Sequence, residues 1–361
     1  MTEGETKMIM DYETAVDDIL ETKLKPLVKP IDREAYYPRE VIGELAEAGA
    51  FIQGTNRLHE QITREIRLVE QVSAYCMTTG FNLWCHLAAL TYVRHTRNRR
   101  LKERFLPLLE SGAVIGGTGL SNPMKYYAGL ESLHLKAEEQ PGGYVIHGVL
   151  PSVSNLGDGH RFGVIAETFD NRRIMAFVSC DHPNLHMQEK ADYLGLNGSA
   201  TYACRFEGVV ISDEEVLSDD ADLFIKDIRP SFVAYQVPIG LGVAAASVRG
   251  MEKHVNRQSG CNAYLPVQPA DIKERAAAMS DSLARLSKDG RVLSAWEELL
   301  EIRRATAELV LDAVQAGMLH AGGSGYKQTS HEARRLREAY FFVNLTPTVK
   351  QLGKMLDSNG A

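Results

Sequence analysis

Segments with strand character are confined to the middle of this chain, and helical patterns fill both ends. Residues 1–111 and 216–361 carry apolar side chains at the three- to four-residue spacing of amphipathic helices. Residues 112–215 instead combine glycine pairs with alternating runs such as Tyr144-Val-Ile-His-Gly148. This order predicts an α+β multidomain fold with an N-terminal helical domain (1–111), a central antiparallel β domain (112–215) and a C-terminal helical bundle (216–361).

The apolar spacing and the breaking residues also predict the individual elements. Helices are expected at 12–28, 38–50, 59–75, 81–96 and 99–109, and again at 231–256, 269–286, 293–318, 331–342 and 348–356. Strands are expected at 144–148, 162–166, 174–178 and 202–211. Prolines at 123, 141, 151 and 183 argue against any helix in the middle segment.

The composition is that of a folded, acidic protein. Hydrophobic residues make up 44% of the 361 residues and charged residues 24%, which excludes a largely disordered chain. Lys and Arg total 40 against 47 Asp and Glu, a net charge of −7, so neither nucleic acid nor an anionic membrane is expected as a partner. The basic run Arg94–Lys102 is interpreted as a solvated turn.

The 5 cysteines are scattered, and no pair has the CxxC spacing of a zinc or redox site. Buried thiols in a reducing compartment explain this pattern better than disulfides, so we expect a cytoplasmic protein without a metal site. Apolar stretches are interrupted well short of the ~20 residues that a membrane span needs. Adjacent Cys85 and His86 point about 100° apart on a helix, which favours a buried thiol beside a pocket-lining histidine over a nucleophile and its base.

Several short segments follow one another in a fixed order along the chain. They are 103–112 (ERFLPLLESG), 119–123 (GLSNP), 143–155 (GYVIHG, then SVSN), 194–212 (LGLNGSAT, then FEGVVIS), 319–326 (LHAGGSGY) and 337–339 (REA). In this order they resemble the motifs of the acyl-CoA dehydrogenase family, among them RYLPxLxxGE, TEP, WITN and GGxGY. The resemblance covers almost the whole chain.

The resemblance implies a C-terminal four-helix bundle, a homo-oligomer (a dimer or a tetramer) and FAD bound without a covalent link. It implies an acyl-CoA or another acyl thioester as the substrate, α,β-dehydrogenation as the reaction and a place in fatty acid metabolism. An electron-transfer flavoprotein or a flavin reductase is the implied redox partner.

Several residues match the family's flavin-binding positions. Ser121 matches the threonine of TEP and Ser154 the threonine of WIT, so both hydroxyls are expected at the flavin ring; alternatively, each is a turn serine at a strand end. The resemblance implies that Arg257 reaches the FAD pyrophosphate of an adjacent subunit. The other cofactor-binding residues that it implies are Ser259, Gln268, Gly322, Gly323 and Thr348. Ser152 replaces the tryptophan of WIT, which removes an aromatic wall from the expected site.

The usual catalytic carboxylate of the family is missing. The resemblance places the glutamate of the YEGT motif at Thr346, and threonine cannot act as a base near neutral pH. Some members carry the base at the start of the first bundle helix, where Asp227 is the available acid and hence the predicted base; alternatively, it only stabilises a helix N-terminus. Arg229 is predicted to hold a CoA phosphate or the substrate tail, unless it is a solvated surface residue. Asp158 and His160, in the loop after Ser154, are further candidates to approach the substrate.

The leading hypothesis is an FAD-dependent acyl-CoA dehydrogenase-like oxidoreductase acting on an acyl thioester. A flavin-dependent monooxygenase on the same fold needs no glutamate base, in keeping with the departures at Ser152 and Thr346. A catalytically degenerate subunit of a hetero-oligomeric acyl-CoA dehydrogenase would keep the scaffold without the chemistry. Fold alone cannot choose among these three.

Overall fold

The computed structural model describes residues 12–53, 58–190 and 192–359 and confirms the order of helices, strands and helices. The first helix runs from residue 12 to 33, contains a π-helical turn at Leu20–Leu24 and ends in α2 (Lys25–Arg33). It is followed by α3 (Arg39–Glu47), α4 (Leu58–Tyr75), α5 (Met77–His95) and α6 (Arg99–Glu110). These agree with the predicted helices to within a few residues.

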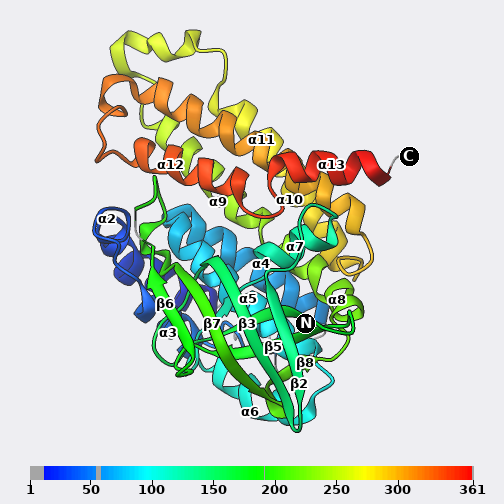
Figure 1. Cartoon of the computed structure of the whole chain (residues 1–361). Helices are drawn as coiled ribbons and strands as arrows, with labels where there is room; N and C mark the ends of the chain where they lie inside the picture. Colours follow the sequence, from blue (N-terminus) through cyan, green and yellow to red (C-terminus); the bar gives the residue numbers. More distant parts are fainter. Residues whose placement is uncertain (1–11, 54–57, 191, 360–361) are drawn as a thin grey trace, which may run out of the picture. The chain divides into compact units, whose positions relative to one another are not determined.

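The middle of the chain forms an eight-stranded sheet with the order β6-β7-β3-β2-β4-β5-β8, and β1 pairs with β4. The strands are β1 (Gly116–Thr118), β2 (Leu135–Gln140), β3 (Gly143–Val153), β4 (Arg161–Thr168), β5 (Arg173–Ser179), β6 (Leu185–Glu189), β7 (Tyr202–Ser212) and β8 (Val216–Ser218). Figure 1 shows β2, β3 and β7 side by side. Ile146 on β3, Phe162 on β4 and Phe206 on β7 belong to one buried hydrophobic core of the sheet.

The expected sheet was wholly antiparallel, and this detail is wrong. β4 pairs in parallel with both β1 and β2, so the sheet is mixed. A parallel pair needs a crossover connection, and β3 with the segment after it provides one between β2 and β4. Pairing partners distant in sequence decide this feature, and the alternating pattern of a single strand does not contain it.

A short helix interrupts the middle segment, against expectation. It is α7 (Ser121–Tyr127), and Pro123 lies in its first turn. Proline is tolerated there because the first N–H groups of a helix have no intrahelical partner. The prolines therefore exclude a helix interior but not a helix start.

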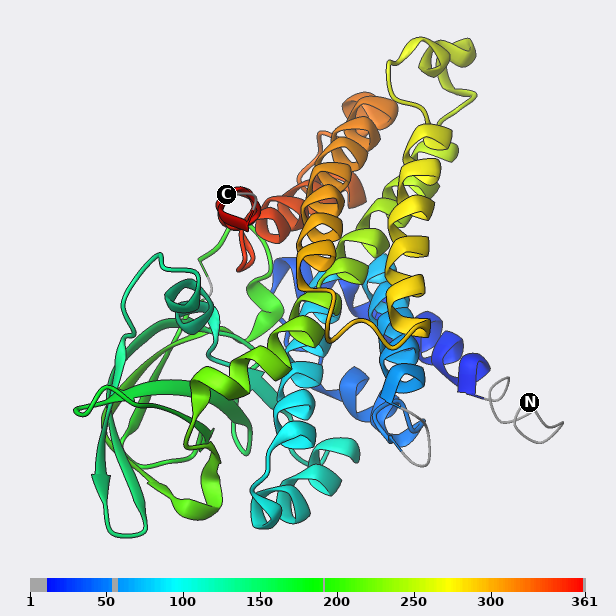
Figure 2. The same ribbon diagram turned by 90° about the vertical axis from the view of Figure 1, so that its right-hand side faces the viewer.

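The C-terminal segment is helical as predicted. Its elements are α8 (Ala221–Ala234), α9 (Val237–Glu252), the 3-10 segment η4 (Arg257–Tyr264), α10 (Pro269–Lys288), α11 (Trp296–Ala321), the 3-10 turn η5 (Gly322–Ser324), α12 (His331–Asn344) and α13 (Val349–Asn359). The single helix expected at 231–256 is wrong. The helix α8 ends at Ala234, and a new helix, α9, begins at Val237 with Pro238 in its first turn. Figure 2 shows α10 and α11 side by side.

The described residues form two compact units. The sheet unit comprises residues 12–53, 82–190, 192–193 and 197–232, and the bundle unit comprises 58–81, 194–196 and 233–359. Both α5 and α8 contribute residues to each unit, so the units do not coincide with boundaries drawn from composition, which stay a prediction. The stretch Ala221–Glu252 is long and apolar enough to cross a membrane, yet 94% of its most apolar 18-residue window is buried, as in the core helices of a folded protein.

Candidate functional site

Three hydroxyl groups meet at the end of β3 in the sheet unit. Ser154 Oγ lies 2.7 Å from Thr201 Oγ1, which lies 2.8 Å from Ser199 Oγ. Ser154 is half-buried, and its backbone forms an antiparallel bridge with Thr118. Hydroxyls both donate and accept hydrogen bonds, so this row suits the polar edge of a heteroaromatic ring. Sequence reasoning chose Ser154 but missed Ser199 and Thr201, although both lie in the quoted segment LGLNGSAT.

Ser121 lies at the first residue of α7 and is exposed. Its neighbour Asn122 is buried and ties down the loop that follows the helix. The Asn122 amide donates to Glu131 Oε1 at 2.8 Å and to the Ser132 carbonyl at 2.9 Å, and its Oδ1 accepts from the backbone of His134 at 2.9 Å. The position of Ser121 is thereby fixed by contacts of the next residue.

Asp227, the predicted base, lines a cavity of about 420 Å³ in the sheet unit. Its carboxylate is on the exposed side of α8, and the same cavity is lined by His95, Asn98 and Asp213. Burial lowers the pKa of His95, although its hydrogen bond with the Thr91 carbonyl and the charge of Asp227 act in the opposite direction. A neutral imidazole and a carboxylate therefore face the same space near neutral pH.

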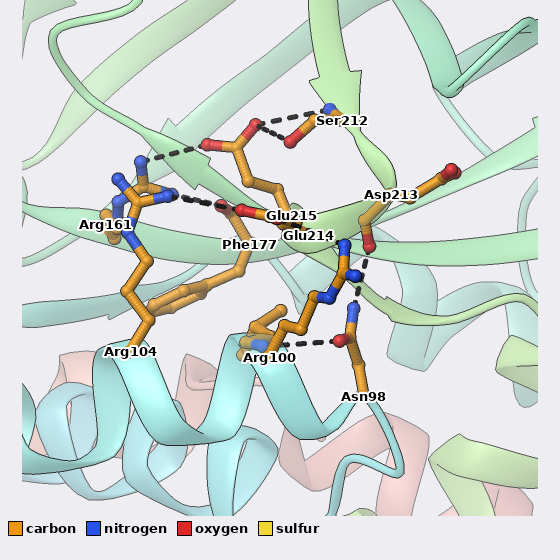
Figure 3. Close-up of polar contacts among 10 residues, drawn as sticks. Asn98, Arg100, Arg104, Arg161, Phe177, Ser212, Asp213, Glu214 and Glu215 are labelled. Carbon is orange, nitrogen blue, oxygen red and sulfur yellow. Dashed lines mark hydrogen bonds and ion pairs between the residues drawn. The ribbon is translucent and has the colours of Figure 1, made fainter.

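The cavity wall is held rigidly by polar contacts (Figure 3). The turn η3 (Asp213–Glu215) is anchored by Arg161, which contacts Glu215 at 2.9 Å, and by Asn98, which donates to the Asp213 carbonyl at 2.7 Å. Burial alone would raise the pKa of Glu215, but hydrogen bonds from Arg161 and Ser212 lower it. Arg100 pairs with Glu214 at 3.4 Å, so part of the basic run forms ion pairs within the protein.

The structure separates the predicted residues of the sheet unit into different surroundings. Among the described residues that line the cavity, neither Ser121 nor Ser154 occurs. Arg229 is half-buried, and burial lowers its pKa. Because Arg229 follows Asp227 by two positions on a helix, the two side chains point about 200° apart and do not face one space. The roles of these residues stay predictions.

A second group of predicted residues meets at one end of α11 in the bundle unit. Arg257 Nη1 donates to Ser324 Oγ at 3.3 Å, beside the turn Gly322–Gly323. A Cβ added at either glycine would meet no atom within 4 Å, and Gly322 has a φ of 58°. Asn262 ties η4 to α11 by donating to the His320 carbonyl at 3.0 Å. A guanidinium, a hydroxyl and an open backbone turn together suit a phosphate group.

The remaining bundle residues hold local structure. The Gln268 amide donates to the carbonyls of Asn262 at 3.0 Å and Leu265 at 2.7 Å, at the start of α10. Thr348 caps α13, because its Oγ1 accepts from the Gln351 backbone at 3.4 Å. Ser259 is exposed and has a φ of 55°. Gln268 and Thr348 therefore have structural partners of their own.

Thr346, where the resemblance places the family's glutamate, is buried in a chain of polar contacts. Its carbonyl accepts from Gln236 Nε2 at 2.9 Å, and Gln236 Oε1 accepts from Arg303 Nε at 3.0 Å. Arg303 is fully buried, donates to the Phe342 carbonyl at 2.8 Å and lies 3.9 Å from the centre of the Phe342 ring. Burial lowers the pKa of Arg303 to about 9, so the group is still charged near neutral pH.

Cys85 on α5 is fully buried, as predicted. The neighbouring His86 was expected to line a pocket, but it is fully buried too and is not among the residues that line the described cavity. Burial raises the pKa of Cys85 and lowers that of His86 to about 3. His86 Nδ1 accepts from the Gly116 backbone at 3.0 Å, which leaves Nε2 to donate to the Leu109 carbonyl at 3.1 Å. Within the described part of the chain, no group of three or more His, Cys, Asp or Glu residues is arranged to hold a metal ion.

Comparisons with known proteins agree with this architecture. The sequence model of the acyl-CoA dehydrogenase N-terminal domain matches residues 6–113. The mitochondrial isovaleryl-CoA dehydrogenase of Oryza sativa subsp. japonica is 28% identical over 296 residues, covering 76% of this chain and 70% of the relative.

Two solved structures show the same fold at low sequence identity. An acyl-CoA dehydrogenase of Bacillus anthracis complexed with FAD has a TM-score of 0.82 at 15% identity, covering 99% of this chain and 68% of that one. A dibenzothiophene monooxygenase of Paenibacillus sp. A11-2 has a TM-score of 0.78 at 14% identity, covering 96% of each chain. The N-terminal part of the chain therefore matches the acyl-CoA dehydrogenase N-terminal domain, and the chain shares the fold of these two solved structures.

Proposed function

We propose that this protein is an FAD-dependent oxidoreductase of the acyl-CoA dehydrogenase type, which removes hydrogen from the α and β carbons of an acyl thioester. The observation that carries the proposal is the row of hydroxyls at Ser154, Thr201 and Ser199, at the strand end where the family motif WIT places a flavin contact. FAD, when bound, supplies a hydride acceptor.

The residues present fit such a cofactor in chemical type. In the sheet unit, Ser154 and Thr201 offer hydroxyls to a polar ring edge. In the bundle unit, Arg257 and Ser324 offer charged and neutral donors beside the uncrowded Gly322 turn, which would suit the pyrophosphate of an FAD bound to an adjacent subunit. Ser152 is exposed in place of the family tryptophan, so one ring face is less enclosed than in typical members.

The proton on the α carbon needs a base from this chain. Thr346 cannot serve, because its side chain has no carboxylate. We assign the role to Asp227, whose carboxylate is exposed to the cavity that neutral His95 also lines. Burial lowers the pKa of His95, so the imidazole that lines the same cavity is uncharged near neutral pH.

The partner and the assembly follow from the same proposal. An electron-transfer flavoprotein or a flavin reductase would exchange electrons with the cofactor, and the protein would work as a homo-oligomer in the cytoplasm, in fatty acid metabolism. An acyl-CoA is the first substrate class to test, since the relative named above is an isovaleryl-CoA dehydrogenase.

The test is the visible spectrum of the purified protein followed by an anaerobic titration with acyl-CoAs of increasing chain length. We expect a bound flavin whose absorption band is bleached by an acyl-CoA and not by free CoA, which serves as the control. A flavin-containing protein that no acyl-CoA bleaches would contradict the dehydrogenase proposal.

A flavin-dependent monooxygenase is the second candidate, favoured by the absent carboxylate at Thr346. The fold is compatible with it, because the dibenzothiophene monooxygenase shares the architecture. This candidate predicts substrate oxygenation that depends on oxygen and on a reductase supplying reduced flavin. Acyl-CoA bleaching in the anaerobic titration would argue against it.

A further inference from the structure

A buried hydrogen-bonded network surrounds Asn155, the residue directly after Ser154. Asn155 lies in the sheet unit and is fully buried. Both the nitrogen and the oxygen of its side-chain amide form hydrogen bonds. Nδ2 donates to the Gly116 carbonyl at 2.8 Å, and Oδ1 accepts from the Tyr37 hydroxyl at 2.7 Å. The Gly116 carbonyl sets which way the amide faces, since a reversed amide would direct an oxygen at that carbonyl, and the Tyr37 hydroxyl then donates to the amide oxygen.

The backbone of Asn155 is held as firmly as its side chain. Its N–H donates to the Ser199 carbonyl at 2.9 Å, and its carbonyl accepts from His160 Nδ1 at 3.0 Å. Its φ is 64°, a left-handed conformation that asparagine tolerates and glycine adopts without strain. Glycine would therefore satisfy the backbone here, and the asparagine is distinguished by what its amide contacts.

Gly116, at the start of β1, is fixed from both sides. Its carbonyl accepts from Asn155, while its N–H donates to His86 Nδ1 at 3.0 Å. The next residue, Gly117, allows β1 to lie close to the segment after β3, because a Cβ at this position would lie only 2.9 Å from the Ser154 carbonyl oxygen. Buried donors and acceptors that lose a partner carry the full cost of desolvation, so this network resists movement.

From these contacts we propose that Asn155 is a positioning residue, oriented by the Gly116 carbonyl and bound by the Tyr37 hydroxyl, that holds Ser154 and Ser199 where their hydroxyls meet a flavin ring. The network links Asn155 to Ser199 through the backbone and to β1 through Gly116, and Ser154 lies between them. Neither Tyr37 nor Asn155 has a polar atom assigned to the flavin itself. The proposal rests on the flavoprotein function proposed above.

The test compares Tyr37→Phe and Asn155→Gly with the wild-type protein. Asn155→Gly keeps the left-handed backbone and removes the amide. Asn171→Gly is the matched control, because Asn171 is also an asparagine with a left-handed φ, of 59°, but is exposed in the β4–β5 turn. The measurements are the FAD dissociation constant, the absorption spectrum and midpoint potential of the bound flavin, and the melting temperature of the flavin-free protein.

We expect both network variants to bind FAD about tenfold more weakly and to shift the absorption band and the potential, because the hydroxyls change their contact with the ring. The Asn171→Gly control should match the wild type in all three flavin measurements. If Asn155→Gly does not fold, Tyr37→Phe, which deletes one hydroxyl, decides the question.

Two other outcomes would overturn the proposal, and they are distinguishable. Variants that melt earlier without flavin, yet hold FAD with the wild-type affinity, spectrum and potential, would leave Asn155 a structural residue only. A wild-type protein that binds no flavin would refute the proposed function, and the positioning role with it.

Discussion

Replacing Gly242 by alanine tests the close approach of two helices in the bundle unit. A Cβ at Gly242, on α9, would lie 2.5 Å from the Glu70 carbonyl oxygen, 2.7 Å from Ser73 Cβ and 2.8 Å from the Ala74 nitrogen, all on α4. Two of these atoms belong to the backbone, and the third is fixed directly to it. No side-chain rotation can relieve the contact, so the helices must separate.

The expected magnitude is the difference of two opposing effects. Alanine is favoured over glycine inside a helix by about 1 kcal/mol. Overpacking of a tight contact costs about 1–3 kcal/mol, and distances well below van der Waals contact put this case at the upper end. We therefore expect Gly242→Ala to lower the free energy of unfolding by about 2 kcal/mol. With an unfolding entropy of about 2.1 cal/mol/K per residue, this lowers the melting temperature by about 3 °C.

The assay is urea unfolding followed by circular dichroism, with Gly43→Ala as the matched control. Gly43 also lies inside a helix, α3, but a Cβ there would meet no atom within 4 Å. Only the propensity effect remains at that position, so the control should gain about 0.5–1 kcal/mol. A Gly242→Ala protein as stable as the wild type would refute the described approach of α9 to α4.

The remaining predictions concern the missing base and the buried charges. Asp227→Asn should slow flavin bleaching by acyl-CoA about 10²–10⁴-fold in stopped-flow measurements, and an unchanged rate would remove Asp227 as the base. Thr346→Glu should restore a carboxylate at the family position and raise the same rate in the Asp227→Asn background; no gain would argue against that position. Glu338→Gln breaks a buried ion pair with Arg334, at 2.8 Å, and should lower the free energy of unfolding in urea by about 3–5 kcal/mol. The control Glu207→Gln, in an exposed ion pair, should lower it by less than about 1 kcal/mol. Equal losses in the two variants would contradict the burial of the Glu338–Arg334 pair.

The order of helices and strands could be predicted because it depends on local periodicity. The helices expected at 59–75 and 269–286 match α4 and α10 closely, since apolar spacing is a property of each segment alone. The parallel pairs of β4 could not be predicted in this way. They depend on which strands become neighbours, a choice made by contacts between residues far apart in the chain.

The candidate site shows the same division. Ser154 could be chosen from a motif, but Thr201 comes beside it only because β3 pairs with β7, with Val153 opposite Tyr202. The role of Tyr37 is still harder to predict from the sequence, because its hydrogen-bond partner Asn155 lies 118 residues further along the chain. No local pattern encodes such contacts, whereas the folded sheet unit brings them together.

The segment around Thr346 is held by a buried polar network although it offers no carboxylate. Gln236 binds the Thr346 carbonyl, and buried Arg303 binds Gln236 and the Phe342 carbonyl. Burying a guanidinium costs free energy unless it is hydrogen-bonded, so the network favours a defined structure in this segment. A dehydrogenase then needs its base elsewhere, whereas a monooxygenase needs none. Bleaching of the wild-type flavin by an acyl-CoA separates the two functions, and the rate of Asp227→Asn then tests whether Asp227 is the base.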